Sequence, residues 1–335
     1  MGQTFSFTVD FLRVQLFTKL PVTHDDLTGR TYLVTGSNTG LGLALAIHLA
    51  RLHPRPAHPR RSRFWELDMA SFASVIQFAE RANTTLNRLD GAVLNAGVNK
   101  KDWDVTPDGW ERTLQTNVLS TGLLGVLLLP LLQTTSKLPS PRPESAIPPH
   151  LTITSSEGMT IAKFSEKSAS SILKAMNDQS QCPDMLDRYF TSKLLNLFLA
   201  REIAKLPQTR GVVIKCVLLF FSEPDYVLIW AFSAVYSTVT PGLCVSELGR
   251  DYDVPAVAAF ILGLLSFTAA QGALNLLYAV LRPTPPAAYI YGCKVVNPPT
   301  WTESKEGLRV QAKLWSEMVE LWRTVCPEVV NIRGL

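Results

Sequence analysis

The chain has 335 residues, a net charge of +4 and a hydrophobic fraction of 47%. This length allows a large α/β core, and a charge so small and dispersed excludes nucleic acid as the expected partner. Five widely spaced cysteines without a CxxC pair and five histidines without ligand spacing predict no metal site, and they favour free thiols in a reducing compartment, the cytoplasm.

The N-terminal residues 1–27 are expected to form an extension to one domain at 28–335. Residues 10–20 could make a short apolar helix that packs on this domain. The alternative is a helix that rests on a membrane surface. A secretory signal is not expected, since no basic segment precedes a cleavable apolar core.

A glycine-rich turn follows the first predicted strand, residues 31–35. Gly36, Gly40 and Gly42 lie in this turn, and a helix is predicted directly after it, over 43–52. Glycines permit a tight turn and close approach of the backbone to a pyrophosphate, while the helix N-terminus offers free N–H groups. The pattern predicts a dinucleotide site, although a plain strand–turn–helix would give the same spacing.

Strands and helices then alternate along the chain. The predicted strands cover 64–67, 91–94, 151–154 and 211–217, and the predicted helices cover 71–86, 107–132 and 187–205. This alternation predicts a doubly wound parallel sheet, Rossmann-like, with helices on both faces. Gly36, Asp68, Asn95 and Ser156 follow successive strand ends, where such sheets bind ligands.

Tyr189 and Lys193 are four positions apart, so they share one face of a helix. An ammonium held beside a phenol stabilises the phenolate and makes tyrosine a usable acid–base group near neutral pH. The same spacing also occurs by chance on solvated helix faces. The neighbouring motifs therefore decide its meaning.

Together these motifs resemble the short-chain dehydrogenase/reductase family over about residues 28–300. Thr35 to Gly42 is similar to the family's TGxxxGxG loop and Asn95 to Gly97 to its NAG motif. Thr240, Pro241 and Gly242 are similar to its later Pro-Gly loop. The long gap between Ser156 and Tyr189 resembles retinol-dehydrogenase-like members, including fungal ones of secondary-metabolite pathways.

The resemblance implies a role for each matching residue. Tyr189 would be the proton donor or acceptor, and Lys193 would lower its pKa and hold the nicotinamide ribose. Ser156 would bind the substrate oxygen, with Ser155 as the weaker choice, and Asn117 would hold the helix geometry and a water. The implied cofactor-binding residues are Gly36, Ser37, Thr39, Gly40, Leu41, Gly42, Asp68, Asn95, Ala96, Gly97, Tyr189, Lys193 and Ser246, with Asp68 on the adenine and Ser246 on the nicotinamide carboxamide.

Two regions depart from the family pattern. Residues 53–63 hold three prolines and are too short for a strand and a crossover helix, so the usual second strand and the following helix are expected to be missing. Residues 218–239 read as an apolar insertion after the sixth strand. A lost exon segment and a retained intron would explain both departures.

Residues 255–281 contain no charged side chain, and their length meets the criterion for a membrane span. A pair of buried helices beside an apolar substrate site is the preferred interpretation.

The expected function is NADP-dependent oxidoreduction between a carbonyl and a secondary alcohol on an apolar small molecule, in a secondary-metabolite pathway. NADP is preferred over NAD because residues 53–63 contain arginines, and in the family this region carries the residue that contacts the 2′ position of the ribose. One alternative is a catalytically impaired or mis-spliced relative that only binds. Another is a membrane-associated retinoid- or steroid-type dehydrogenase. A homo-oligomer is possible.

Overall fold

A single sheet organises the molecule. The computed structural model describes residues 21–53, 63–145, 147–182, 184–221, 243–244, 248, 267–285 and 288–335. The described strands run in the order β1-β2-β3-β4-β6-β7, with β5 beside β4, and every pair is parallel except β6 with β7. The strands are β1 (Tyr32–Val34), β2 (Gly91–Leu94), β3 (His150–Ser156), β4 (Val213–Phe221), β5 (Leu243–Cys244), β6 (Ala288–Tyr291) and β7 (Lys294–Val295).

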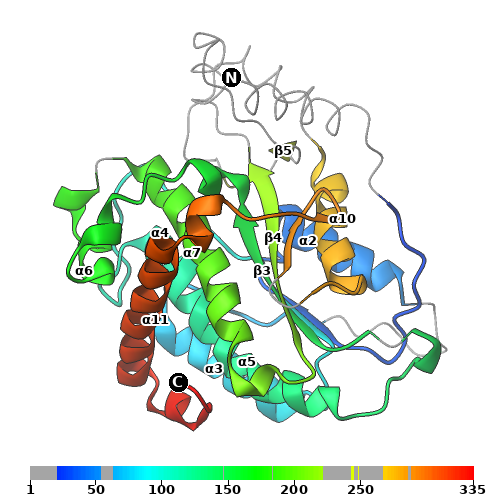
Figure 1. Cartoon of the computed structure of the whole chain (residues 1–335). Helices are drawn as coiled ribbons and strands as arrows, with labels where there is room; N and C mark the ends of the chain where they lie inside the picture. Colours follow the sequence, from blue (N-terminus) through cyan, green and yellow to red (C-terminus); the bar gives the residue numbers. More distant parts are fainter. Residues whose placement is uncertain are drawn as a thin grey trace.

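Helices cover both faces of the sheet (Figure 1). The α-helices are α2 (Gly40–Arg51), α3 (Phe72–Thr85), α4 (Arg112–Leu114), α5 (Ser120–Ser136), α6 (Ile172–Met176), α7 (Met185–Ala204), α10 (Ala269–Leu281) and α11 (Lys305–Val325). A π-helical turn, η1 (Gln115–Leu119), joins α4 to α5. The 3₁₀ turns are η2 (Pro143–Ser145), η3 (Glu157–Ile161), η4 (Ser165–Ser168), η5 (Gln179–Gln181), η6 (Pro207–Thr209), η8 (Thr300–Glu303) and η9 (Pro327–Asn331).

The buried strand β2 shows how the two layers are built. Its four residues are all buried, and successive side chains point to opposite faces. Ala92 and Leu94 join the large core beneath α3, α5, α7 and α11, whereas Val93 joins the smaller core beneath α2 and α10. A strand covered on both faces must be apolar throughout, so this arrangement confirms the predicted doubly wound α/β fold.

The predicted strand at 64–67 was wrong. Residues 63–67 have no strand pairing, and β1 is the last strand at this edge of the described sheet. The strand that would precede it in the chain, its expected neighbour, is the second strand of the family pattern. Residues 54–62, where that neighbour was expected to be missing, lie outside the described residues.

The predicted helix at 107–132 begins later and is not uniform. Val105 and Glu111 form an isolated bridge, and the Glu111 carboxylate then accepts from the N–H groups of Thr113 and Leu114, both at 2.7 Å. This capping starts the helix at Arg112. The continuous stretch Arg112–Ser136 is long and apolar enough to cross a membrane, but 78% of its apolar window is buried, as in the core helix of a soluble domain.

Two expected apolar segments are only partly described. Strand β4 continues to Phe221, so residues 218–221 of the expected insertion are strand, and 222–239 lie outside the described residues. Of 255–281, the described part is α10 with its preceding residues Phe267 and Thr268, and this helix packs against α2 (Figure 1). The helix expected at 10–20 also lies outside the described residues.

Candidate functional site

The glycine loop after β1 requires glycine at two close approaches. Gly36 has φ 66°, and a Cβ there would lie 2.9 Å from the Cα of Ala96. A Cβ at Gly42 would lie 2.2 Å from the carbonyl oxygen of Gly36. Both distances are too short for any side chain. The loop therefore folds tightly onto its own helix and onto the segment after β2.

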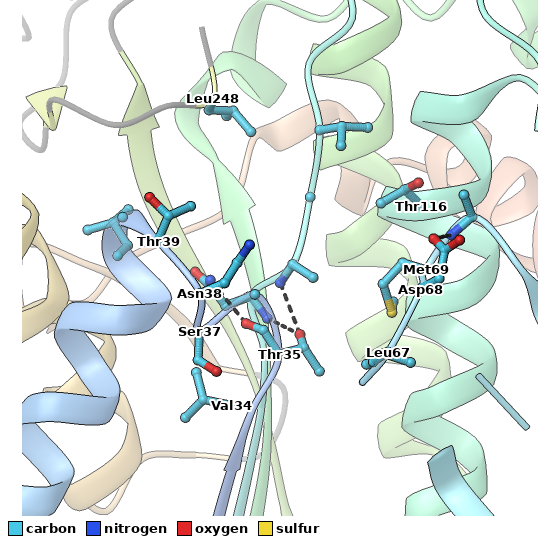
Figure 2. Close-up of a pocket in the computed structure, with 18 of the residues that line it drawn as sticks. Val34, Thr35, Ser37, Asn38, Thr39, Leu67, Asp68, Met69, Thr116 and Leu248 are labelled. Atoms are coloured by element: carbon cyan, nitrogen blue, oxygen red, sulfur yellow. Dashed lines mark hydrogen bonds between the residues drawn. The ribbon is translucent and has the colours of Figure 1, made fainter. Parts of the chain in front are cut away.

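Thr35 joins the ends of β1 and β2. Its Oγ1 accepts hydrogen bonds from the backbone N–H groups of Asn95 and Ala96, both at 3.0 Å. The Asn95 amide in turn donates to the Thr35 carbonyl at 3.2 Å. Figure 2 shows these bonds beneath the loop. Thr35 belongs to the TGxxxGxG motif but was not among the predicted site residues. Its buried side chain, which bonds the segment after β2, shows that it helps to build the site.

A cavity of about 900 Å³ opens between the glycine loop and residues 64–70. Most predicted cofactor residues line it: Gly36, Ser37, Thr39, Gly40, Leu41, Asp68, Asn95, Ala96 and Gly97. In Figure 2 the residues of 37–39 and of 67–69 lie on opposite sides of it. Further lining residues, which sequence reasoning missed, include Trp65, Lys100, Thr116 and Leu248.

The start of α2 fits a pyrophosphate. Thr39 is the N-cap residue and lines the cavity, yet its side chain makes no capping hydrogen bond. The binding of a dinucleotide phosphate requires a cavity, a tight glycine loop and a helix N-terminus with free N–H groups, and all three are present here. These residues would hold the pyrophosphate of a nicotinamide cofactor.

Asp68 lies on the opposite wall and is exposed. Its carboxylate accepts from the N–H of Ala70 at 2.9 Å, and its own N–H donates to Ser74 Oγ at 2.9 Å. The side chain therefore shapes its own turn. Its predicted contact with adenine stays a prediction.

Asn117 occupies the π-helical turn η1, and such turns are frequent at functional sites. Its Oδ1 accepts from the N–H of Val98 at 2.8 Å, and its Nδ2 donates to the Val98 carbonyl at 2.8 Å and to Ser192 Oγ at 3.0 Å. Ser192 Oγ donates to the Tyr189 carbonyl at 2.6 Å. Asn117 thus connects the loop after β2 with α7.

Tyr189 and Lys193 lie on one face of α7, as the spacing predicted. Both are buried, and the Lys193 Nζ lies 5.6 Å from the centroid of the Tyr189 ring. The Nζ donates to the Thr154 carbonyl at 3.3 Å. Burial lowers the pKa of Lys193 to about 8, and the nearby Cys216 opposes this shift. The ammonium is therefore the main form at neutral pH.

The two serines at the end of β3 have different environments. Ser155 Oγ donates to the Lys193 carbonyl at 2.6 Å and lies 3.4 Å from the Met159 Sδ. Ser156 Oγ accepts from the Gly158 N–H at 3.2 Å, which leaves its own proton available for another acceptor. The geometry favours Ser156 over Ser155 as a group that could meet a ligand.

Gly97 lies between the cavity and the buried Tyr189–Lys193 pair. It lines the cavity, and a Cβ at this position would lie 3.1 Å from Asn117 Oδ1 and 3.3 Å from Lys193 Nζ. The structure thus brings Asn117 and Lys193 against the cavity wall at Gly97. Tyr189, Lys193 and Ser156 themselves do not line this cavity. Ser246 and residues 240–242 lie outside the described residues.

Comparisons with known proteins agree with this geometry. Residues 53–137 match the family model described as short chain dehydrogenase. The chain is 34% identical to a short chain dehydrogenase of Alternaria solani over 84% of this chain and 95% of the relative. It is 30% identical to a short chain dehydrogenase/reductase of Cryptosporiopsis sp. over 96% of this chain and 99% of the relative.

A solved structure supports the fold. The 3-alpha-hydroxysteroid dehydrogenase from Pseudomonas sp. B-0831, solved with NADH, matches with a TM-score of 0.54 at 17% identity, over 78% of this chain and 94% of that one. The chain belongs to the short-chain dehydrogenase/reductase family, a class of NAD(P)-dependent oxidoreductases.

Proposed function

We propose that this protein is an NADP-dependent oxidoreductase that interconverts a carbonyl and a secondary alcohol on an apolar small molecule. The observation that carries the proposal is the convergence at Gly97, where the wall of the dinucleotide cavity touches Asn117 and Lys193. Lys193 in turn faces the Tyr189 ring. A cofactor site and an acid–base pair therefore adjoin.

Each polar residue has one task in this proposal. The bound nicotinamide supplies or accepts the hydride. Tyr189 moves a proton between its phenol oxygen and the substrate oxygen, and the Lys193 ammonium stabilises the phenolate. Ser156 donates its free proton to the same substrate oxygen. Asn117 bonds both the loop after β2 and Ser192 of α7, so it fixes the position of this loop relative to α7.

Support for NADP comes from the arginines of the shortened segment. Residues 53–63 contain Arg55, Arg60, Arg61 and Arg63 and no acidic residue, whereas an acidic side chain there would favour NAD. The test is a titration of intrinsic fluorescence with NADPH and with NADH. Trp65 lines the cavity, so it serves as the reporter and Trp65→Phe as the control. Tighter binding of NADH would overturn the NADP assignment.

The support for an apolar substrate is the apolar surroundings of the proton donor. Phe190 packs beside Tyr189 with ring centroids 5.9 Å apart, and Met159, which is buried within η3, lies 3.4 Å from Ser155 Oγ. The fungal relatives support a role in a secondary-metabolite pathway. The free thiols of Cys182, Cys216, Cys293 and Cys326 support a cytoplasmic location. A panel of apolar ketones and aldehydes with NADPH, read by cofactor oxidation, tests this. Turnover confined to charged substrates would contradict it.

A second function is favoured by one observation. Residues 63–67 are not paired as a strand, and Phe64, at their start, is 82% exposed. A relative with a weakened adenosine wall could bind ligands without catalysis. Saturable NADPH binding and turnover that is lost in Tyr189→Phe would favour the enzyme. Saturable NADPH binding by folded protein without any turnover would favour the relative that only binds.

A further inference from the structure

A buried arginine precedes the predicted proton donor. The Arg188 side chain is fully buried, and its Nη2 lies 2.9 Å from Glu166 Oε1 and its Nε 3.8 Å from Glu111 Oε2, both on buried glutamates. Burying three ionisable groups costs several kcal/mol per ion unless the pairing is good, so such a cluster is weak evidence for stability. Its location suggests another purpose.

The cluster joins three segments that surround the catalytic residues. Glu111 caps the helix that leads through α4 into η1 and Asn117, and α4 packs against α7 (Figure 1). Glu166 lies in η4, within the long segment between Ser156 and Tyr189. Arg188 lies in the first turn of α7.

Asn177 strengthens the same junction. Its Oδ1 accepts from the Glu111 N–H at 2.7 Å, and its Nδ2 donates to the Gly109 carbonyl at 3.0 Å. The segment between Ser156 and Tyr189 is thus fixed to the start of α4 by two hydrogen bonds from the Asn177 side chain to the backbone, as well as by the ion pairs. Arg188 is the one charge of the cluster that sits on α7.

We propose that Arg188 is a positioning residue that holds the first turn of α7, and with it Tyr189, against Lys193 and the Asn117 turn. The ends of helices fray more easily than their middle, and Tyr189 is only the fifth residue of α7 whereas Lys193 lies one turn deeper. Anchoring Arg188 to Glu111 and Glu166 keeps the phenol within reach of the ammonium. This proposal rests on the proposed role of Tyr189.

The test follows the phenol itself and needs no substrate. The ultraviolet absorbance of phenolate is titrated with pH in the wild-type chain and in Tyr189→Phe, and the difference reports Tyr189 alone. The same difference is taken in the Arg188→Met background. We expect the midpoint to rise by about one pH unit, the size of effect that a displaced neighbouring charge has on a titrating group. An unchanged midpoint in folded Arg188→Met would overturn the proposal.

Two further variants separate positioning from folding. Glu166→Gln keeps the shape of the side chain and one acceptor for Arg188 but removes a charge. We therefore expect the Tyr189 midpoint to rise by a smaller amount. This variant tests the proposal even if Arg188→Met fails to fold. Arg201→Met is the matched control, because Arg201 lies on the same helix, bonds the Thr302 carbonyl at 3.0 Å and lies 3.7 Å from Glu303. It should lower thermal stability and leave the midpoint unchanged. Equal shifts in the Arg201→Met and Glu166→Gln proteins would sink the proposal.

The same titration separates the role of Tyr189 from the role of Arg188. If the wild-type phenol titrates no lower than a free tyrosine, the proposed role of Tyr189 fails. If it titrates lower but Glu166→Gln and Arg188→Met leave it unmoved, only the role of Arg188 fails.

Discussion

The two walls of the cofactor cavity are held in different ways. The wall of the glycine loop is linked to β2 by Thr35 and continues through Gly97 to Asn117 and Lys193. The opposite wall, residues 64–70, has no strand pairing. It is held by side chains: the Phe72 N–H donates to Asp108 at 2.7 Å, and Trp65 packs between Phe78 and Arg81.

The predicted acid–base centre is built without residues 64–70. Its groups come from β3, η1 and α7, which pack around the middle of the sheet, far along the chain from residues 53–63. Changes in residues 64–70 should therefore leave the predicted acid–base residues in place. Mutations on the two walls should have unequal effects.

The largest effect is expected on the chemistry. Tyr189→Phe removes the only hydroxyl of this side chain and should lower kcat by about 10²–10⁴-fold, the usual contribution of a general acid or base. Binding of NADPH, measured by Trp fluorescence, should weaken far less, by at most the loss of about one hydrogen bond, roughly 2–10-fold. A Tyr189→Phe protein with full activity would contradict the mechanism.

Gly42→Ala should be the most damaging change on the loop wall. A Cβ there meets the Gly36 carbonyl at 2.2 Å, so the loop must open. Overpacking of this kind costs about 1–3 kcal/mol, or roughly 5–150-fold in NADPH affinity if the loop bears the strain. Gly125→Ala is the matched control, because its nearest neighbours are side-chain ends at 3.3–3.4 Å. Equal affinity losses in both variants would show that the loop is not the strained element.

Thr35→Val tests the link between the two strand ends. The change leaves the N–H groups of the half-buried Asn95 and Ala96 without their acceptor, and each loss costs at most about 1–3 kcal/mol, the figure for a fully buried donor. The free energy of unfolding, measured in urea, should fall accordingly. Thr35→Ser keeps the oxygen and should recover most of it. If Thr35→Ser is as unstable as Thr35→Val, the methyl group and not the hydrogen bonds matters.

The pH profile reports on Lys193. Its pKa is lowered to about 8 by burial, so the ammonium is present below this pH and is lost as pH rises through it. Reduction requires a protonated Tyr189 beside a charged Lys193. The kcat for NADPH-dependent reduction should therefore fall above about pH 8. A rate that stays constant far above this pH would show that the charge is not needed.

The smallest effect is expected on the opposite wall. Asp68 is exposed and already shapes its own turn, so Asp68→Ala removes at most one ligand hydrogen bond. Affinity for NADPH should fall by about 2–10-fold, the equivalent of 0.5–1.5 kcal/mol. If Asp68→Ala lost more NADPH affinity than Gly42→Ala, the wall at 64–70 would be the more important of the two for cofactor binding.

Much of the fold was predictable because its signals are local. The strand at 91–94 and the helices at 71–86 and 187–205 matched β2, α3 and α7 within two residues. Apolar runs and helical periodicity arise from neighbours in the sequence. The strand predicted at 64–67 failed because pairing is not local, and an apolar run becomes a strand only when another strand lies beside it.

The sequence by itself determined the chemistry of the site: a glycine turn, a Tyr–Lys pair at helical spacing, and polar residues after successive strands. Only the tertiary structure decided how these groups are held. It placed Gly97 against Asn117 and Lys193, assigned Ser155 to the Lys193 backbone, and gathered Arg188, Glu111 and Glu166 from three segments. Residue types fix which reactions are possible, whereas distances between remote segments exist only once the chain has packed.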